Sequence, residues 1–199
     1  MKKVLIVVLA VIAASVSLSA QSTGMTIRAG YSPYTFKSDG SSINTSGVMA
    51  GFSAGNYVSS SVPLYVDYGV DLHYAWKSWK VGDERLKMNF LSGVIPVNFG
   101  YKFDVQGSVL SFSPYAGLAA GINIVANGTY DGESASLFDS DDDGDGSWKR
   151  FQLGAQVGIK ITINNKIVIG YEFRPFITEV AESTKSSYNT FYISLPLNF

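Results

Sequence analysis

Apolar and polar side chains alternate along most of this chain with a period of two residues. In the clearest segment, from Leu64 to Trp76, the even-numbered positions are apolar or aromatic, whereas the odd-numbered positions include Asp67, Asp71 and His73. Successive side chains of a β-strand point to opposite faces, so this segment predicts a strand with one apolar face and one mixed polar face.

The same alternation recurs and predicts eight strands. They cover residues 25–31, 48–55, 64–76, 86–103, 110–124, 151–161, 167–174 and 191–199. In the fourth segment Leu86, Met88 and Phe90 are out of phase with Ile95 and the positions after it. This break in phase predicts a β-bulge between Phe90 and Val94.

The distribution of glycine indicates which face of the strands lies inside. A lipocalin-type soluble barrel also alternates, but it turns its apolar face inward. Ten glycines fall on the polar face: Gly30, Gly51, Gly55, Gly69, Gly100, Gly117, Gly121, Gly154, Gly158 and Gly170. The crowded interior of an eight-stranded barrel needs small residues beside large ones, whereas hydrocarbon favours a continuous apolar wall. We therefore predict an all-β fold, an eight-stranded antiparallel up-and-down transmembrane β-barrel.

The links between the strands alternate in length. Longer links (37–47, 77–85, 127–147 and 180–188) alternate with shorter ones (59–62, 104–108 and 164–165). Outer-membrane barrels combine long external loops with short periplasmic turns. The pattern predicts a location in the outer membrane of a Gram-negative bacterium with both termini periplasmic, and Asn164-Asn165 suits a type I′ hairpin turn.

The first 20 residues have the layout of a secretory signal peptide. Two lysines precede an apolar run from Val4 to Ala14, and small residues then lead to Ala20. The run is shorter than the roughly 20 residues that a membrane-spanning helix needs, which disfavours the alternative of an anchor. Residues 21–199 are therefore predicted to be the barrel domain. The chain has no cysteine, which excludes a disulfide and a lipid-modified cysteine.

The last predicted strand carries a candidate assembly signal. Alternate positions are hydrophobic and the final residue is aromatic: Phe191, Ile193, Leu195, Leu197 and Phe199. This strand resembles the C-terminal β-signal that the outer-membrane assembly machinery reads, which makes that machinery an expected partner. An ordinary terminal strand is the alternative.

Two neighbouring segments resemble a known family. Ile95–Phe103 (IPVNFGYKF) and, after a short turn, Ser113–Gly121 (SPYAGLAAG) resemble the outer-membrane β-barrel domain family of small exported proteins, akin in architecture to the transmembrane domains of outer membrane proteins A and X. The alternating pattern is similar over roughly the whole mature chain. Short motifs are shared only in these two segments and at the C-terminus. It implies a fold and a location, and it carries over no catalytic residue.

The ionisable residues of the polar face have nearly balanced signs. The predicted polar network of the lumen comprises Arg28, Asp67, Asp71, His73, Lys102, Lys160, Glu172 and Arg174. An eight-stranded barrel is just wide enough inside for side chains, so we expect ion pairs that plug the lumen. A narrow channel for small solutes is the alternative.

His73 is the only histidine of the chain, and it shares the predicted inner face with Asp67 and Asp71. An Asp–His pair is able to act as a general base, so a hydrolase of lipid or peptide working at the barrel rim is an alternative function. Such a site also needs a positioned serine, which the pattern does not supply. We therefore predict no catalytic, cofactor-binding or metal-binding residue, no cofactor, and a protein that is not an enzyme.

The longest link contains an acidic segment from Asp139 to Asp145. Its alternating carboxylates followed by Gly144 resemble the start of a calcium loop, but the twelfth position is Arg150 rather than glutamate. A solvated acidic loop is favoured, and calcium binding is the alternative.

Aromatic residues gather near the loop-side strand ends and predict a girdle at the lipid interface: Tyr31, Tyr34, Phe36, Tyr74, Trp76 and Trp79. A carbohydrate-binding patch is the alternative for these rings.

Together these features predict a closed barrel with a structural, adhesive or partner-binding role exerted through its external loops. Charged residues make up only 16% of the chain, against about 25% in a typical soluble domain. The formal net charge of -1 gives no reason to expect nucleic acid. The other expected partners are outer-membrane lipid, including lipopolysaccharide, and an unidentified extracellular partner.

Overall fold

The computed structural model describes residues 22–38, 40–59, 61–81, 84–130, 132–138 and 148–197. Eight strands form a ring: β1 (Ser22–Tyr31), β4 (Ser46–Tyr57), β5 (Leu64–Val81), β6 (Glu84–Tyr101), β8 (Leu110–Tyr130), β10 (Phe151–Ile163), β11 (Ile167–Pro175) and β12 (Thr184–Leu197). Shorter strands lie at its ends: β2 (Tyr34–Ser38), β3 (Ser41–Asn44), β7 (Phe103–Asp104) and β9 (Glu133–Ser136). No helix among the described residues is long and apolar enough to cross a membrane.

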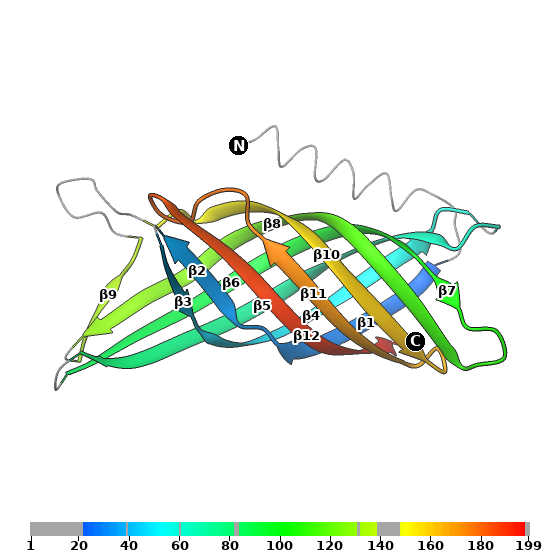
Figure 1. The fold of residues 1–199 in the computed structure, drawn as a ribbon, viewed down its shortest axis with the longest axis horizontal. Coiled ribbons are helices and arrows are strands. Elements are labelled where there is room, and N and C mark those ends of the chain that lie inside the picture. Colours follow the sequence, from blue (N-terminus) through cyan, green and yellow to red (C-terminus); the bar gives the residue numbers. More distant parts are fainter. Residues whose placement is uncertain are drawn as a thin grey trace.

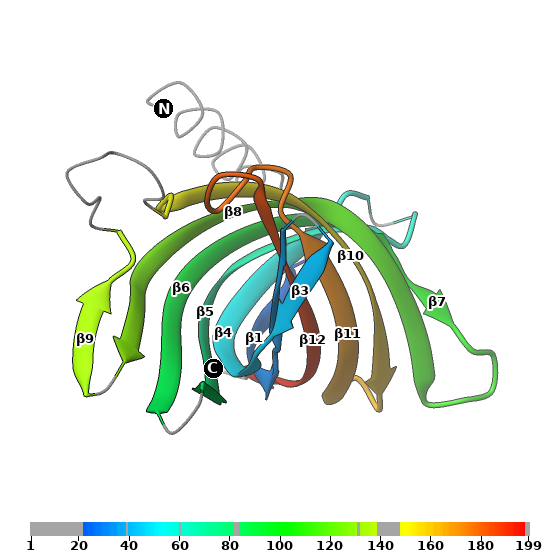
Figure 2. The same ribbon diagram turned by 60° about the vertical axis from the view of Figure 1, so that its left-hand side comes forward.

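The ring is closed. Each of its strands pairs antiparallel with the next one along the chain, and β1 pairs with β12 from Met25 opposite Leu197 to Tyr31 opposite Phe191. Figures 1 and 2 show the tilted strands wound around a common axis. Closure gives every ring strand a partner on both sides, which removes the exposed edges of an open sheet. The predicted eight-stranded antiparallel barrel is thereby confirmed.

The two faces of the strands have the polarity that the glycine pattern predicts. Val70 and Leu72, on the apolar face of β5, are 41% and 50% exposed on the outside of the barrel. Asp71 lies between these two residues on the strand and His73 follows Leu72. Both side chains are buried inside the barrel. The wall is therefore apolar outside and polar inside, the reverse of a soluble barrel.

The predicted irregularity exists, but it belongs to the neighbouring strand. Between β6 and β8 the register shifts by one residue, because Leu91 lies opposite Val125 whereas Ser92 lies opposite Asn123. Ile124 of β8 is thus the additional residue of the bulge.

Strand β6 itself keeps one parity throughout. Phe90 and Val94 are both buried inside the barrel, as is Asn98 further along the strand. The apolar residues before the break in phase are therefore not turned toward lipid, and they mark a part of the lumen that is apolar.

The two ends of the barrel differ. The terminus end carries the described chain ends, Ser22 and Leu197, and short links that include the tight turn between β10 and β11. In that turn Asn164 and Asn165 have φ values of 54° and 55°, as the predicted hairpin turn requires.

The loop end is the opposite one, on the left in Figure 1. There the strands are longer than predicted, since β5 continues to Val81 and pairs with β6 up to Glu84, and β8 continues to Tyr130. Part of the predicted loops is therefore hairpin. The predicted signal peptide (1–20), Phe199 and the acidic segment 139–145 lie outside the described residues.

Candidate functional site

Two arginines and two carboxylates form the centre of the lumen. Arg28 donates to Asp71 twice, from Nε to Oδ1 over 2.8 Å and from Nη2 to Oδ2 over 2.7 Å. Arg174 donates from Nη2 to Asp71 Oδ2 over 2.9 Å and to Glu172 Oε1 over 2.7 Å. These four side chains are at most 3% exposed. Each buried charge thus has an opposite charge beside it, which offsets the loss of its hydration.

A glycine makes the Arg28–Asp71 pair possible. Gly51 of β4 lies directly opposite Arg28 on β1 and directly opposite Asp71 on β5, so the three residues form one row across three strands. A Cβ at position 51 would fall against Oδ1 of Asp71. The Arg28 guanidinium therefore reaches Asp71 across β4, because Gly51 places no side chain between them.

Neutral side chains complete the centre. The Arg174 Nε atom donates to Oε1 of Gln156 over 2.7 Å, and Gln156 Nε2 donates to Oε2 of Glu172 over 3.0 Å. The Tyr115 hydroxyl donates to the same carboxylate oxygen over 3.1 Å. The predicted polar network includes neither Gln156 nor Tyr115, although both lie on the polar parity of their strands.

His73 extends this network toward the loop end. Its Nε2 lies 3.0 Å from Arg174 Nη1, and its Nδ1 lies 2.8 Å from the Ser32 hydroxyl. A guanidinium only donates, so Nε2 accepts, and Nδ1 then carries the proton and donates to Ser32. The Ser32 hydroxyl also forms a hydrogen bond with the Thr190 hydroxyl, with the two oxygens 2.8 Å apart. The ring also stacks on Tyr188, with centroids 4.1 Å apart.

The serine that a catalytic triad needs is thus present beside His73, but the geometry is unlike that of a nucleophilic site. The His73 atom nearest to Asp71 is Nε2, at 4.0 Å, and that atom already accepts from Arg174. A working base needs its proton-accepting nitrogen directed at the serine. Ser32, His73 and Asp71 are also at most 1% exposed, so a substrate has no access to them.

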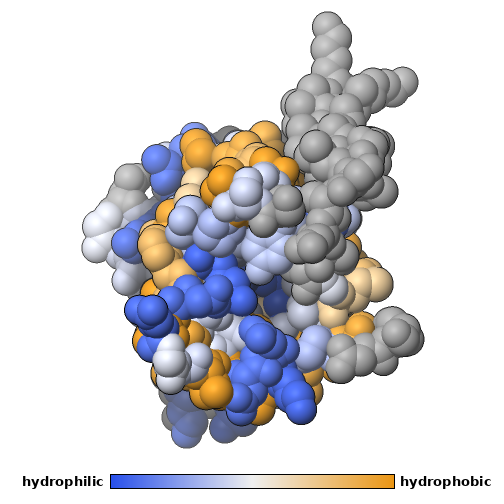
Figure 3. All heavy atoms as spheres, turned by 90° about the vertical axis from the view of Figure 1, so that its right-hand side faces the viewer, coloured by the Kyte–Doolittle hydropathy of each residue, from blue (hydrophilic) through white to orange (hydrophobic). Residues whose placement is uncertain are grey.

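A second charge cluster lies toward the terminus end. Lys160 pairs with Asp67, which also accepts from Asn98 Nδ2 over 2.8 Å. Lys160 and Asp67 border a cavity of about 320 Å³ that extends to the rim. Lys102 lies at that rim and pairs with Asp104 over 3.1 Å, apart from the central network. Figure 3, which faces this end, shows hydrophilic side chains gathered at the mouth.

Three tyrosine rings inside the barrel lie against glycines of the adjacent strand, and two of them, Tyr65 and Tyr192, also line this cavity. The pairs are directly opposite each other in the sheet: Tyr65 with Gly100, Tyr115 with Gly158 and Tyr192 with Gly170. A Cβ at any of these glycines would overlap the ring. Three of the inward glycines that the sequence marks are therefore places where tyrosine rings lie against the barrel wall.

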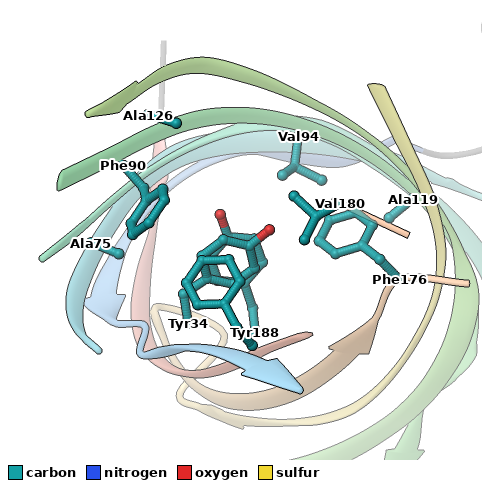
Figure 4. Close-up of a cluster of buried hydrophobic side chains, with 10 residues drawn as sticks. Tyr34, Ala75, Phe90, Val94, Ala119, Ala126, Phe176, Val180 and Tyr188 are labelled. Atoms are coloured by element: carbon teal, nitrogen blue, oxygen red, sulfur yellow. The ribbon is translucent and has the colours of Figure 1, made fainter. Parts of the chain in front are cut away.

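The loop end of the lumen is filled by apolar and aromatic side chains. Figure 4 shows Tyr34 and Tyr188 at its centre, and their rings stack with centroids 4.2 Å apart. The cluster consists of Tyr34, Phe36, Ala75, Phe90, Val94, Ala119, Ala126, Phe176, Val180 and Tyr188. Gln152 joins it to polar groups, because it accepts from the Tyr34 hydroxyl over 2.8 Å.

This cluster corrects the predicted girdle. Tyr31, Tyr74 and Trp76 are 51%, 44% and 39% exposed on the outer wall, but Tyr34 and Phe36 are buried inside. The physical reason is parity, because Tyr34 and Phe36 are even-numbered like Arg28, whose side chain points inward. Trp79 lies on the inward parity of β5.

The links at the loop end pack over this cluster. The Leu137 amide donates to the Ala126 carbonyl over 2.8 Å, and the Trp148 amide donates to the Leu137 carbonyl over 2.9 Å. The Trp148 ring lies 4.9 Å from Phe36 and 5.1 Å from Phe90, measured between centroids. The described part of the longest link is thus held against the barrel mouth. Among the described residues, no group of three or more His, Cys, Asp or Glu side chains is able to hold a metal ion.

A closed antiparallel barrel with an apolar outer wall and an interior of paired charges is a membrane-spanning β-barrel. The family model of the outer membrane protein beta-barrel domain matches residues 5–199, and the chain belongs to this family. The predicted family and the location in the outer membrane of a Gram-negative bacterium are thereby confirmed. No curated protein matches the chain significantly.

The solved structures that are similar to the chain include the following three. Neisserial surface protein A is 15% identical, with a TM-score of 0.55, over 89% of this chain and 99% of that one. Ail, the attachment invasion locus protein of Yersinia pestis, is 13% identical, with a TM-score of 0.51, over 87% and 99%. The outer membrane enzyme PagL is 11% identical, with a TM-score of 0.50, over 84% and 99%. At these identities the likeness concerns the fold alone.

Proposed function

We propose that this protein is a closed, non-enzymatic outer-membrane barrel that presents its loop end to a binding partner outside the cell. The observation that carries the proposal is the filled lumen. The Arg28–Asp71–Arg174–Glu172 centre and the aromatic cluster lie in series along the axis, and both consist of buried side chains. Conduction of a solute would require both to move.

The described part of the loop end supports a binding role because packing and strand pairing hold it on the barrel. Trp148 and Leu137 hold the longest link on the barrel, and β2 pairs with β12 beyond the ring. A surface that is already ordered loses less conformational entropy on binding. Exposed hydrophobic side chains at this end, Ile43, Tyr130 and Ile177, are 40%, 49% and 67% exposed and are suited to contact a partner.

The proposal includes the orientation that the link lengths predict, with the terminus end in the periplasm and the loop end outside. One of the similar structures is the attachment invasion locus protein of Yersinia pestis. Because that likeness concerns the fold, it supports the plausibility of an adhesive role for this architecture and assigns no ligand.

The experiment compares the three candidate functions in the full chain. We expect no unitary conductance in planar bilayers, no hydrolysis of lipid or peptide substrates, and adhesion of cells that display the protein to at least one of a panel of immobilised matrix proteins. Replacing the β8–β9 hairpin with a two-residue turn should abolish adhesion and leave the barrel folded. Conductance, or hydrolysis that is lost in His73→Ala, would refute the proposal.

A further inference from the structure

The outer wall of the β5–β6 hairpin changes character toward the loop end. Val70 and Leu72 are exposed aliphatic residues, and Tyr74 and Trp76 follow on the same face of β5, with stacked rings 5.6 Å apart. Beyond them the same face carries the exposed Lys80. Tyrosine and tryptophan rings prefer the level where hydrocarbon meets the headgroups. The cations beyond them therefore lie at the level of the lipid headgroups.

Three cations are close together on this face. Lys80 lies directly opposite Arg85 of β6, and Lys87 follows Arg85 by two residues on the same side and lies opposite Ser78. All three cations are exposed. Like charges directly opposite each other in an antiparallel pair repel, so an anion bound between these side chains would relieve a repulsion built into the hairpin.

No acidic side chain that the structure describes neutralises this face. Strand β8 places Thr129 opposite Lys87. Among the side chains that the structure describes, no carboxylate forms an ion pair with Lys80, Arg85 or Lys87. This contrasts with the lumen, where every central charge has an opposite partner.

A shallow hollow lies beside the cations and above the rings. Its volume is about 350 Å³, and it is lined by Tyr74, Trp76, Lys77, Ser78, Lys87 and Asn89. The Tyr74 hydroxyl donates to Asn89 Oδ1 over 3.2 Å, which fixes the ring at the floor. The hollow thus combines fixed rings with ammonium groups that are able to bind an anion.

We propose that this face, Lys80, Arg85 and Lys87 with the hollow beside them, binds a phosphate group of lipopolysaccharide in the surrounding leaflet. Arginine and lysine form charge-assisted hydrogen bonds with phosphate oxygens. The occupant is a lipid because the hollow lies on the outer wall directly beyond the aliphatic surface and not on the loop-end surface. The inference is independent of the adhesive role, since it concerns the wall that faces lipid, but it rests on the proposed orientation, which places the loop end in the outer leaflet.

The test titrates the folded full-length mature chain in neutral detergent with diphosphorylated lipid A and counts bound lipid by native mass spectrometry. The variant R85Q/K87Q should bind at least about tenfold more weakly, because each cation near an anionic headgroup adds to the attraction. The matched control K149Q/K166Q removes two exposed lysines elsewhere and should bind like the wild type. Circular dichroism shows whether each variant is folded.

Two further lipids make the result specific. Lipid A without its phosphates should bind the wild type as weakly as lipid A binds R85Q/K87Q. Equal affinity of the wild type and R85Q/K87Q for lipid A would overturn the proposal. Equal affinity of the wild type for phosphatidylglycerol and lipid A would also overturn it, because any anionic headgroup would then suffice.

Discussion

Arg174 and Asp71 form an ion pair, with Nη2 2.9 Å from Oδ2, in which neither side chain has any exposed surface. Asp71 simultaneously accepts from Arg28, so one carboxylate binds two guanidinium groups. Glu172 provides the second negative charge, 2.7 Å from Arg174. The centre of the lumen is therefore electrically balanced only when all four side chains are present.

Replacing Asp71 with asparagine should destabilise the barrel strongly. Removing one partner of a buried ion pair leaves an uncompensated charge, and the expected loss in the free energy of unfolding is about 3–5 kcal/mol. The measurement is urea unfolding of the protein refolded into lipid vesicles, followed by tryptophan fluorescence. Asp104→Asn is the control, because that side chain is 71% exposed and its pair with Lys102 contributes at most about 1 kcal/mol. A loss below 1 kcal/mol for Asp71→Asn would contradict the structure.

Replacing Val70 with arginine tests the outward face. Val70 is exposed on the lipid-facing wall in the middle of β5, so a charge there should reduce the unfolding free energy by about 2–4 kcal/mol. Ser78→Arg is the matched control on the same strand and face, beyond Trp76, where the effect should be about 0–1 kcal/mol. Similar losses at both positions would mean that the aromatic rings do not mark the edge of the hydrocarbon.

Much of the fold follows from one property of the sequence, the period of two residues. It predicts which residues form the strands and which side faces lipid, because a strand within a membrane barrel is in contact with hydrocarbon on one side only. It also brings Arg28, Asp71 and Arg174 to the inner face. It does not predict which charges pair, since that depends on the register between strands, and so the central role of Asp71 comes from the structure.

Two errors show where local pattern is insufficient. The residue type and the position of Tyr34 and Phe36 predict the lipid interface, although their parity with Arg28 indicates the interior. The break in phase at Phe90 predicts a bulge in its own strand, whereas Phe90 keeps the inward parity and lies in an apolar part of the lumen. A sequence pattern does not reveal that one lumen changes from polar to aromatic along its axis.

The row formed by Arg28, Gly51 and Asp71 makes Gly51→Ala a sensitive test of the network. The added methyl group meets Asp71 and the backbone of Val70, so we expect a loss of about 1–3 kcal/mol in the unfolding free energy. The control is Gly128→Ala, where the nearest atom to a built Cβ is 3.6 Å away, an ordinary contact. If both substitutions have the same small effect, Arg28 does not reach Asp71 across β4.

Replacing His73 with alanine distinguishes a structural histidine from a catalytic one. The change removes the acceptor of Arg174 Nη1, the partner of Ser32 and the ring stacked on Tyr188. A buried donor left without its partner costs about 1–3 kcal/mol, and the lost ring contact adds about 0.5–1.5 kcal/mol. His73→Gln offers an acceptor and a donor and should recover part of this loss, measured by the same vesicle unfolding. A catalytic histidine would instead be replaceable by alanine with no change in stability, so a fully stable His73→Ala protein would argue against the network described for the lumen.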